Sequence, residues 1–199
     1  MTTVGIIAEY NPFHRGHAHQ IEEIRKRYGA DTRIIAVMSG NFPQRGDVAI
    51  ADKYTRAKAA VVGGVDLVLE LPFPFCGESA PVFAAAGVAI LHALGTVDVL
   101  SFGAEENDVS RLAKAAETVS DGVFLEEIHA LSKHSENGYP EVFYRTVAEK
   151  AGKDTADLFL VPNNLLGIEY IKESKKMTGE NAPCLFYPIE FNIFSIKIP

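Results

Sequence analysis

Cysteine is scarce in this sequence. Its 199 residues contain two, Cys76 and Cys184, which are too few for a disulfide framework and whose spacing fits no zinc-binding pattern. Cys76 has no histidine near it in the sequence, so we interpret it as a small buried apolar residue and not as a nucleophilic thiol. We therefore expect a protein of the reducing cytoplasm.

Long apolar runs are also absent. No run reaches the roughly 18 to 20 residues that a membrane-spanning helix needs. The N-terminus leads almost at once into a predicted strand and lacks the basic and apolar regions of a signal peptide. No internal repeat or low-complexity segment interrupts the chain, and we expect no membrane association.

An excess of basic residues is missing as well. The chain has 19 Lys and Arg against 26 Asp and Glu, a net charge of −7. Broad, sequence-independent binding of nucleic acid needs a positive field, so this class of function is disfavoured. A local basic patch remains possible at Arg45, Lys53, Arg56 and Lys58, although a solvated charged helix face is the more ordinary interpretation.

What the chain does contain is a regular alternation of short apolar runs and amphipathic stretches. Strands are predicted at residues 4–8, 33–38, 65–71, 97–102 and 185–189. Helices are predicted at 16–29, 52–63 with Asp52 as the cap, 80–94, 109–119, 124–131, 140–151 and 165–177. This order predicts a Rossmann-like α/β fold, a parallel sheet with helices on both faces, with a helical segment at about 108–178.

Two histidines mark the junction between the first strand and the first helix. His14 and His17 lie three residues apart, where a helix N-terminus exposes unpaired N–H groups and the positive end of its dipole. Such a site suits a phosphate chain, and Gly16 lets the backbone come close to it. Two alternatives stay open: surface histidines that merely cap the helix, and a metal site made with His19. The metal site lacks the four-residue helical spacing and an obvious carboxylate partner.

Other candidate site residues are predicted to lie at the same edge of the sheet, where ligands of parallel sheets bind. The loops at 11–17 and 39–47 follow strands, and Gly103 lies just past the end of another. Gly103 allows close approach of a base or ribose, or is an ordinary turn glycine. Glu9, at a strand end, needs a basic partner or Mg²⁺ if it is buried.

Longer strings resemble a known family. The string Glu9-Tyr10-Asn11-Pro12-Phe13-His14-Arg15-Gly16-His17 is similar to the bacterial tRNA(Met) cytidine acetate ligases, a branch of the His-x-Gly-His nucleotidyltransferase superfamily. Further agreement lies at residues 37–42, 44–46, 66–72, 101–105 and 162–167. The match runs from the start of the chain to about Pro188.

The resemblance implies a HUP-type nucleotide-binding domain at residues 1–188 and a two-step reaction. ATP and acetate give acetyl-adenylate and pyrophosphate, and the acetyl group then passes to N4 of the wobble cytidine of elongator tRNA(Met) with release of AMP. ATP, acetate and this tRNA are the implied partners, and Mg²⁺ is expected with ATP. In this setting the four basic residues named above are candidate tRNA contacts.

The resemblance also implies the ATP site. Its residues are Ile7, Ala8, Glu9, Tyr10, Asn11, Pro12, Phe13, His14, Arg15, Gly16, His17, Ala18, His19, Gln20, Gly103, Asn163 and Asn164. His14 and His17 are the implied catalytic pair, as donors to the phosphoryl oxygens and the departing pyrophosphate, and no protein nucleophile is required. Of the two asparagines we favour Asn163 for ATP, and we expect at least one of them to cap the helix that follows.

The chain departs from the family in its last part. The family's downstream arginine and its Ser-Ala-x-x-Ile-Arg-like phosphate motif are absent, and residues 189–199 form an atypical apolar tail. We expect a recognisable nucleotide pocket and an impaired complete reaction. The alternatives are an adenylyl- or cytidylyltransferase acting on a small phosphorylated substrate, and a nucleotide-binding module without turnover.

Overall fold

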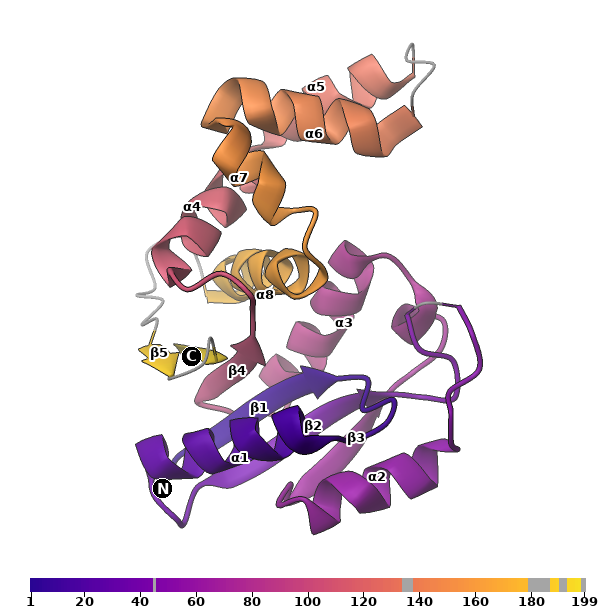
Figure 1. Cartoon of the computed structure of the whole chain (residues 1–199), viewed down its shortest axis with the longest axis vertical. Coiled ribbons are helices and arrows are strands. Elements are labelled where there is room, and N and C mark those ends of the chain that lie inside the picture. Colours follow the sequence, from indigo (N-terminus) through magenta and orange to yellow (C-terminus); the bar gives the residue numbers. More distant parts are fainter. Residues whose placement is uncertain (45, 134–137, 179–186, 190–192, 198–199) are drawn as a thin grey trace.

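A parallel sheet forms the centre of the molecule. The computed structural model describes residues 1–44, 46–133, 138–178, 187–189 and 193–197. Strands β3 (Leu67–Leu71), β2 (Arg33–Ser39), β1 (Thr3–Ala8) and β4 (Val99–Gly103) lie side by side in that order and run parallel. The predicted parallel sheet is confirmed, with β1 in its middle (Figure 1).

Two further strands extend the sheet beyond β4. β6 (Ile193–Lys197) pairs antiparallel with β4, and β5 (Tyr187–Ile189) pairs antiparallel with β6. The fifth strand was predicted at 185–189, of which 185 and 186 lie outside the described residues. β6 was not predicted: it lies in the segment that we treated as an atypical tail, and the division into domain and tail stays a prediction.

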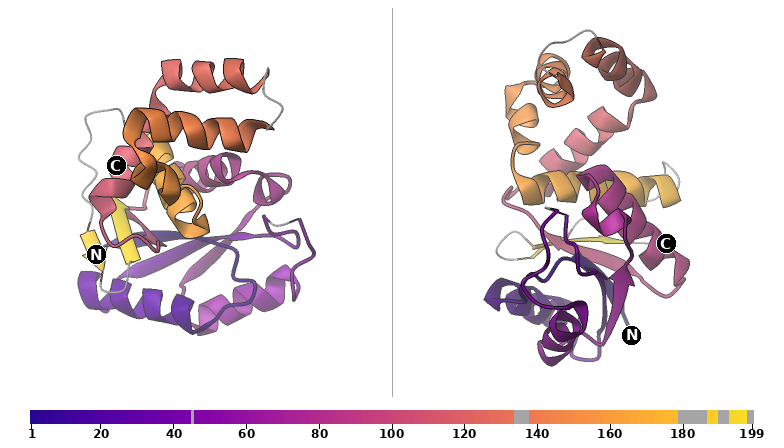
Figure 2. Two further views of the ribbon diagram at one scale, coloured as in Figure 1. Left: turned by 45° about the horizontal axis from the view of Figure 1, so that its top comes forward. Right: turned by 90° about the vertical axis from the view of Figure 1, so that its right-hand side faces the viewer.

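Helices cover both faces of the sheet (Figure 2). α1 (Arg15–Tyr28) and α2 (Lys53–Val62) lie on one face, and α3 (Ala80–Ala93) and α8 (Pro162–Thr178) on the other. Successive strand side chains point to opposite faces and so divide between two cores. The core on the α1 side includes Val4, Ile6, Ile21, Ile24, Ile34 and Ala36, and the core on the α3 side includes Ile7, Ile35, Val37, Phe83 and Leu91.

A helical lobe rises above the α3 face (Figure 1). It consists of α4 (Val109–Ser120), α5 (Gly122–Ser132), α6 (Gly138–Ala151) and α7 (Lys153–Leu158), and its buried side chains continue the core of that face. Each predicted helix is observed, whereas α7 and the short 3-10 helix η1 (Phe75–Gly77) were not predicted. The lobe returns the chain to α8, which therefore lies beside β4 and across the sheet edge from the start of α1.

Helix α2 begins at the predicted cap. The Asp52 side chain accepts hydrogen bonds from the backbone N–H groups of Tyr54 at 2.9 Å and Thr55 at 3.0 Å. Within the described residues, none of the helices combines the length and the apolar content that a bilayer crossing requires.

Candidate functional site

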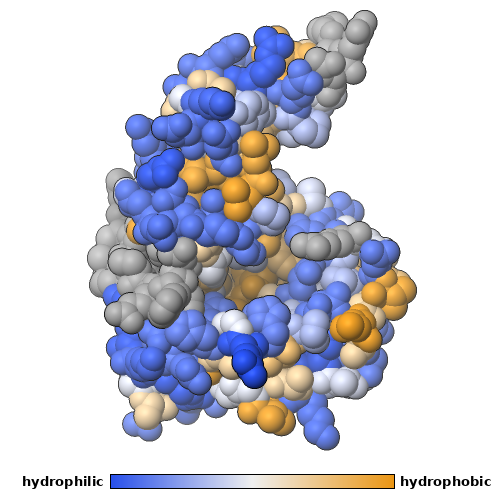
Figure 3. Space-filling model, in the orientation of Figure 1, coloured by the Kyte–Doolittle hydropathy of each residue, from blue (hydrophilic) through white to orange (hydrophobic). Residues whose placement is uncertain are grey.

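A cavity of about 510 Å³ opens at the carboxyl edge of the sheet, between the start of α1 and α8. Its volume is in the usual range for small-molecule sites. Figure 3 shows the opening as a hollow between the helical lobe and the sheet, with apolar residues in its depth. The lining consists of Ile7, Ala8, Glu9, Tyr10, Asn11, Pro12, His14, Gly16, His17, Gln20, Gln44, Phe83, Phe102, Gly103, Pro162, Asn163, Leu166 and Tyr170.

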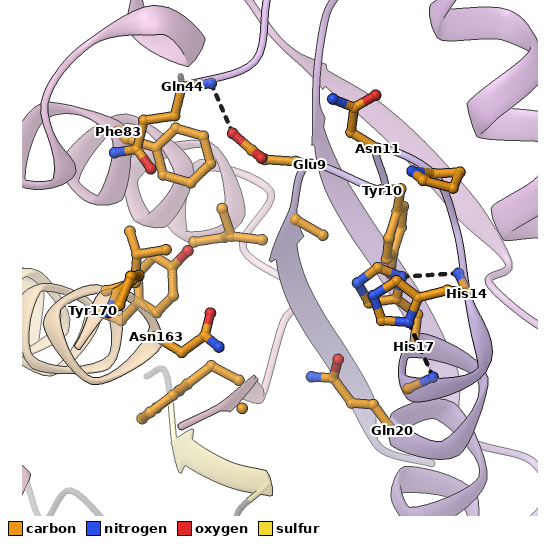
Figure 4. Close-up of a pocket in the computed structure, with 18 residues that line it drawn as sticks. Glu9, Tyr10, Asn11, His14, His17, Gln20, Gln44, Phe83, Asn163 and Tyr170 are labelled. Carbon is orange, nitrogen blue, oxygen red and sulfur yellow. Dashed lines mark hydrogen bonds between the residues drawn. The ribbon is translucent and has the colours of Figure 1, made fainter. Parts of the chain in front are cut away.

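His14 and His17 stand together on one wall of the cavity (Figure 4). His14 is the N-cap of α1: its Nδ1 accepts a hydrogen bond from the Gly16 N–H at 3.1 Å. His17 completes a capping box, because its Nδ1 accepts from the His14 N–H at 3.2 Å. The two rings are stacked with their centroids 3.7 Å apart. Both histidines thus cap the helix, and because the same two rings also line the cavity, capping is not their whole role in the structure.

These hydrogen bonds fix the neutral tautomer of both rings. A ring whose Nδ1 accepts an N–H carries its proton on Nε2 when neutral. Burial, and secondly the charge of His14, lower the pKa of His17 to about 4. His17 is therefore neutral at pH 7, and Nε2–H is the atom with which each ring can donate to a ligand.

Gly16 makes room for the His14 ring. A Cβ at this position would lie 3.0 Å from His14 Cε1 and 3.2 Å from its Nδ1. The absence of a side chain therefore serves the cap itself, in addition to the close approach of a ligand that the sequence suggested.

Tyr10 packs against the ring of His17. Its φ of +47° places a non-glycine residue in the left-handed region, which costs free energy and is typical of functional turns. The buried ring lies 4.8 Å from the His17 ring and 5.1 Å from the Phe13 ring, centroid to centroid. Tyr10 and the adjacent turn thus hold His17 in place.

The opposite wall is mainly apolar and comes from distant parts of the chain. It includes Phe83 of α3, Phe102 of β4, and Leu166 and Tyr170 of α8. Asn163, Leu166 and Tyr170 are spaced by three and four residues and so share one face of α8. That spacing was visible in the sequence and could have identified Leu166 and Tyr170, whereas nothing local pointed to Phe83 or Phe102. Gln44 and Pro162 were also not expected in the lining.

The prediction that Asn163 or Asn164 caps α8 is wrong. The helix begins at Pro162, so both residues lie inside its first turn, and their side chains bind the loop after β4 instead. Asn164 is buried, and its Oδ1 accepts from the N–H groups of Glu105 and Glu106 at 2.9 Å each. Asn163 Nδ2 donates to Glu105 Oε1 at 2.7 Å. Of the two, Asn163 lines the cavity and Asn164 does not, and Gly103 lines it too; the ATP contacts of Asn163 and Gly103 stay predictions.

Five residues of the expected ATP segment are not part of the lining: Phe13, Arg15, Ala18, His19 and Asn164. The helical period explains three of them. His14, His17 and Gln20 are spaced by three and face the cavity, whereas positions 15, 18 and 19 are turned to other sides of α1. Phe13 packs against α2, where a Cβ at Gly63 would come within 2.4 Å of its ring.

Arg56 is buried and does not belong to the expected basic surface patch. Only 2% of it is exposed, so the expectation of a solvated or RNA-facing side chain is wrong. Its guanidinium donates to the carbonyl oxygens of Glu9 at 2.6 Å and Ser39 at 3.1 Å, and also to Ala51 and Gly40. It thereby ties the ends of β1 and β2 together, because these carbonyls have left the sheet and need donors.

The other basic residues of the patch differ from one another. Lys53 Nζ lies 2.6 Å from Glu70 Oε2, and Lys58 is exposed. Arg45 lies outside the described residues, as does Cys184, while Cys76 is buried with a free thiol as expected. The tRNA contacts of Lys53 and Lys58 stay a prediction.

The metal alternative has no support in the described part of the chain. Groups of three or more His, Cys, Asp or Glu side chains that could hold a metal ion are absent there. In addition, Nδ1 of both His14 and His17 is occupied by a backbone N–H. The two rings are therefore arranged to donate to an anion.

The parallel sheet and the two histidines that line the cavity at the start of α1 together define the class of the protein. Residues 1–185 match the family model described as HIGH Nucleotidyl Transferase. The chain belongs to this family, and the predicted Rossmann-like fold and family resemblance are confirmed.

Within that class the chain is similar to tRNA(Met) cytidine acetate ligases. It is 45% identical over 174 residues to the one from Syntrophotalea carbinolica, which covers 86% of this chain and 41% of that protein. The ligase from Acetivibrio thermocellus is 40% identical over 193 residues, covering 92% and 45%. The crystal structure of Thermotoga maritima TmcAL with bound alpha-thio ATP superposes with a TM-score of 0.78 at 34% identity and covers 90% of this chain and 44% of that one. The chain spans less than half the length of these relatives.

Proposed function

We propose that this chain carries out the ATP-dependent acetylation of tRNA(Met). In the first step a carboxylate oxygen of acetate attacks the α-phosphorus of ATP, forming acetyl-adenylate and releasing pyrophosphate. In the second step N4 of the wobble cytidine of elongator tRNA(Met) takes the acetyl group, and AMP leaves. Acting on tRNA, the protein would work in the cytoplasm.

The observation that carries this proposal is the stacked pair of His14 and His17 at the start of α1, with both Nδ1 atoms accepting backbone N–H groups. The first step builds negative charge on the α-phosphoryl oxygens and on the departing pyrophosphate. Two Nε2–H donors and the positive end of α1 suit that charge, and preorganised donors of this kind are each worth roughly 3 to 4 kcal/mol. The similarity to ATP-bound TmcAL supports ATP as the nucleotide.

The remaining lining residues would contact the adenine and the Mg²⁺ that accompanies ATP. The apolar wall of Phe102, Leu166 and Tyr170 offers a surface for adenine, with Gly103 and Asn163 at its edge. Mg²⁺ would accompany ATP. Because Glu9 is the single acidic side chain among the described residues of the lining, the ion would be held largely by the phosphates, as Mg²⁺ commonly is.

One assay tests the proposal against its rivals. The chain is incubated with ATP, Mg²⁺, acetate and tRNA(Met), and AMP release and N4-acetylcytidine are followed. Acetate-dependent AMP formation with acetylated cytidine supports the proposal. Pyrophosphate release that requires a phosphorylated small molecule would identify an adenylyl- or cytidylyltransferase instead, and ATP binding without product under either condition would identify a binding module.

A further inference from the structure

Glu9 is the acidic residue of the cavity, and its position needs a chemical reason. Its side chain extends from the end of β1 across the opening toward Gln44 (Figure 4). Glu9 Oε1 accepts the Gln44 N–H at 2.7 Å, while the Arg56 guanidinium binds the Glu9 backbone carbonyl at 2.6 Å. The backbone of Glu9 is thus fixed by Arg56, and one oxygen of its carboxylate is committed to the loop.

A carboxylate in this place is unfavourable for two of the three proposed reactants. ATP phosphates and acetate are anions, and like charges a few ångströms apart repel each other. The histidine wall accounts for the anions, so Glu9 is expected to face a donor. Among the proposed reactants the amine N4 of cytidine is such a donor, and carboxylates are the usual protein partners of this group.

The acetyl transfer also needs a proton acceptor at this point. The lone pair of cytidine N4 is delocalised into the ring, so the amine is a weak nucleophile until it loses a proton. We infer that Glu9 is the general base for the acceptor amine: it takes one N4 proton as the N4 lone pair forms the bond to the acetyl carbon. The bond from that carbon to the phosphate oxygen of AMP then breaks, AMP leaves with the electron pair, and the proton passes from Glu9 to solvent.

The surroundings of Glu9 suit an entering nucleobase. The loop that binds Glu9 through Gln44 also carries Phe42, which is 48% exposed and lies 6.1 Å from the exposed Phe73 ring, centroid to centroid. The Asn11 side chain accepts the Ile50 N–H at 2.8 Å and so joins this loop to the cavity rim. Exposed aromatic rings beside a reactive pocket are surfaces on which unpaired bases stack.

This inference rests on the proposed function, and the test separates the two. Acetate-dependent exchange of labelled pyrophosphate into ATP reports the first step, and acetylation of tRNA(Met) reports the second. For Glu9→Gln we expect the ratio of acetylation to exchange to fall about 10²- to 10⁴-fold, the usual worth of a general base. Glutamine keeps the acceptor for Gln44 and for N4 but cannot take a proton.

Two further variants serve as controls. Glu22→Gln makes the same chemical change on the exposed face of α1 and should alter neither step. Glu9→Asp keeps the charge at a shorter reach and should acetylate faster than Glu9→Gln. Circular dichroism of each variant checks that the fold is retained.

Each remaining outcome has a definite meaning. No exchange by the unmodified chain refutes the proposed function and this inference with it. Exchange without acetylation by the unmodified chain leaves the first step of the proposed function standing and overturns its second step, and the inference with that step. If Glu9→Gln loses exchange or ATP affinity, the carboxylate serves Mg²⁺ or adenine, and if it keeps both steps, Glu9 has no catalytic role.

Discussion

Helices α1 and α2 follow neighbouring parallel strands and begin at the same edge of the sheet, yet their first turns are capped in opposite ways. α2 is capped by the Asp52 carboxylate, and the hydrogen bond from the Thr55 hydroxyl lowers the pKa of Asp52. α1 is capped by the imidazoles of His14 and His17, neither of which carries a negative charge. An anionic cap neutralises the positive end of its own helix, whereas a cap without negative charge leaves that end available to an anionic ligand. The kind of cap thus makes the N-terminus of α1, and not that of α2, suitable for an anionic ligand.

The largest effect is expected when α1 receives the cap of α2. In His14→Asp the carboxylate can still accept the Gly16 N–H, because aspartate is a good N-cap. It removes one donor and adds a negative charge where phosphate binds, so ATP affinity should fall about 10²- to 10³-fold. Isothermal calorimetry measures the affinity, and a thermal unfolding curve checks the fold. Unchanged ATP binding would show that the start of α1 is not the anion site.

A large loss of stability is expected when α2 loses its connection to the strand ends. Arg56→Ala leaves buried carbonyls without their donor, and the free energy of unfolding should fall by about 3 kcal/mol. The exposed Lys58→Ala on the same helix is the matched control and should change it by less than about 0.5 kcal/mol. Urea unfolding of both variants measures the difference. Equal stabilities would mean that Arg56 is not a structural tie.

A smaller effect is expected from removing the acidic cap. Asp52→Ala should lower the free energy of unfolding by about 1 kcal/mol, the usual worth of an N-cap. ATP affinity should stay as it is, because Asp52 is not part of the cavity lining. Urea unfolding measures the stability and isothermal calorimetry the ATP affinity. A marked loss of ATP binding would contradict the division of roles between the two helices.

The smallest effect is a dependence of stability on pH. The pKa of His17 is lowered to about 4 in the folded chain, against about 6.5 for an unperturbed histidine. The unfolded state therefore binds more protons between these values, and stability is lost as the pH falls from about 6.5 toward 4. Because His17 is only half-buried, solvent screening keeps this contribution below about 1 kcal/mol.

His17→Asn isolates this contribution. Its side-chain oxygen can accept the His14 N–H, and it does not titrate. In urea unfolding at two pH values inside and above the window, the variant should lose less stability on acidification than the unmodified chain. Equal losses would assign the acid sensitivity to other groups, such as the carboxylates, which titrate lower.

Much of the α1 side of the site was predictable because it is local in sequence. The strand, the turn and the three-residue spacing of His14 and His17 are all contained in one short stretch of chain, and together they indicate a phosphate site. Asp52 was likewise readable as a cap, since its acceptor and its donors are neighbours in the chain.

The rest depended on contacts between distant segments. Arg56 looked like any surface arginine, because the strand-end carbonyls that bury it become acceptors only when β1, β2 and α2 are assembled. Asn164 is of a residue type that is typical of helix caps. Its hydrogen-bond partners, however, lie in the loop after β4, 58 and 59 residues away in the sequence. Sequence spacing identified the motif, and only the tertiary structure reveals which residues of the motif face the cavity.

The space above Gly16 has a consequence for variation at this position. A Cβ there would lie 3.0 Å from His14 Cε1, so the His14 ring would have to move by a few tenths of an ångström, although residue 16 itself need not donate to a ligand. In a saturation mutagenesis of residues 14–17, substitutions at 16 should therefore resemble loss of the first histidine, while the outward-facing position 15 tolerates change.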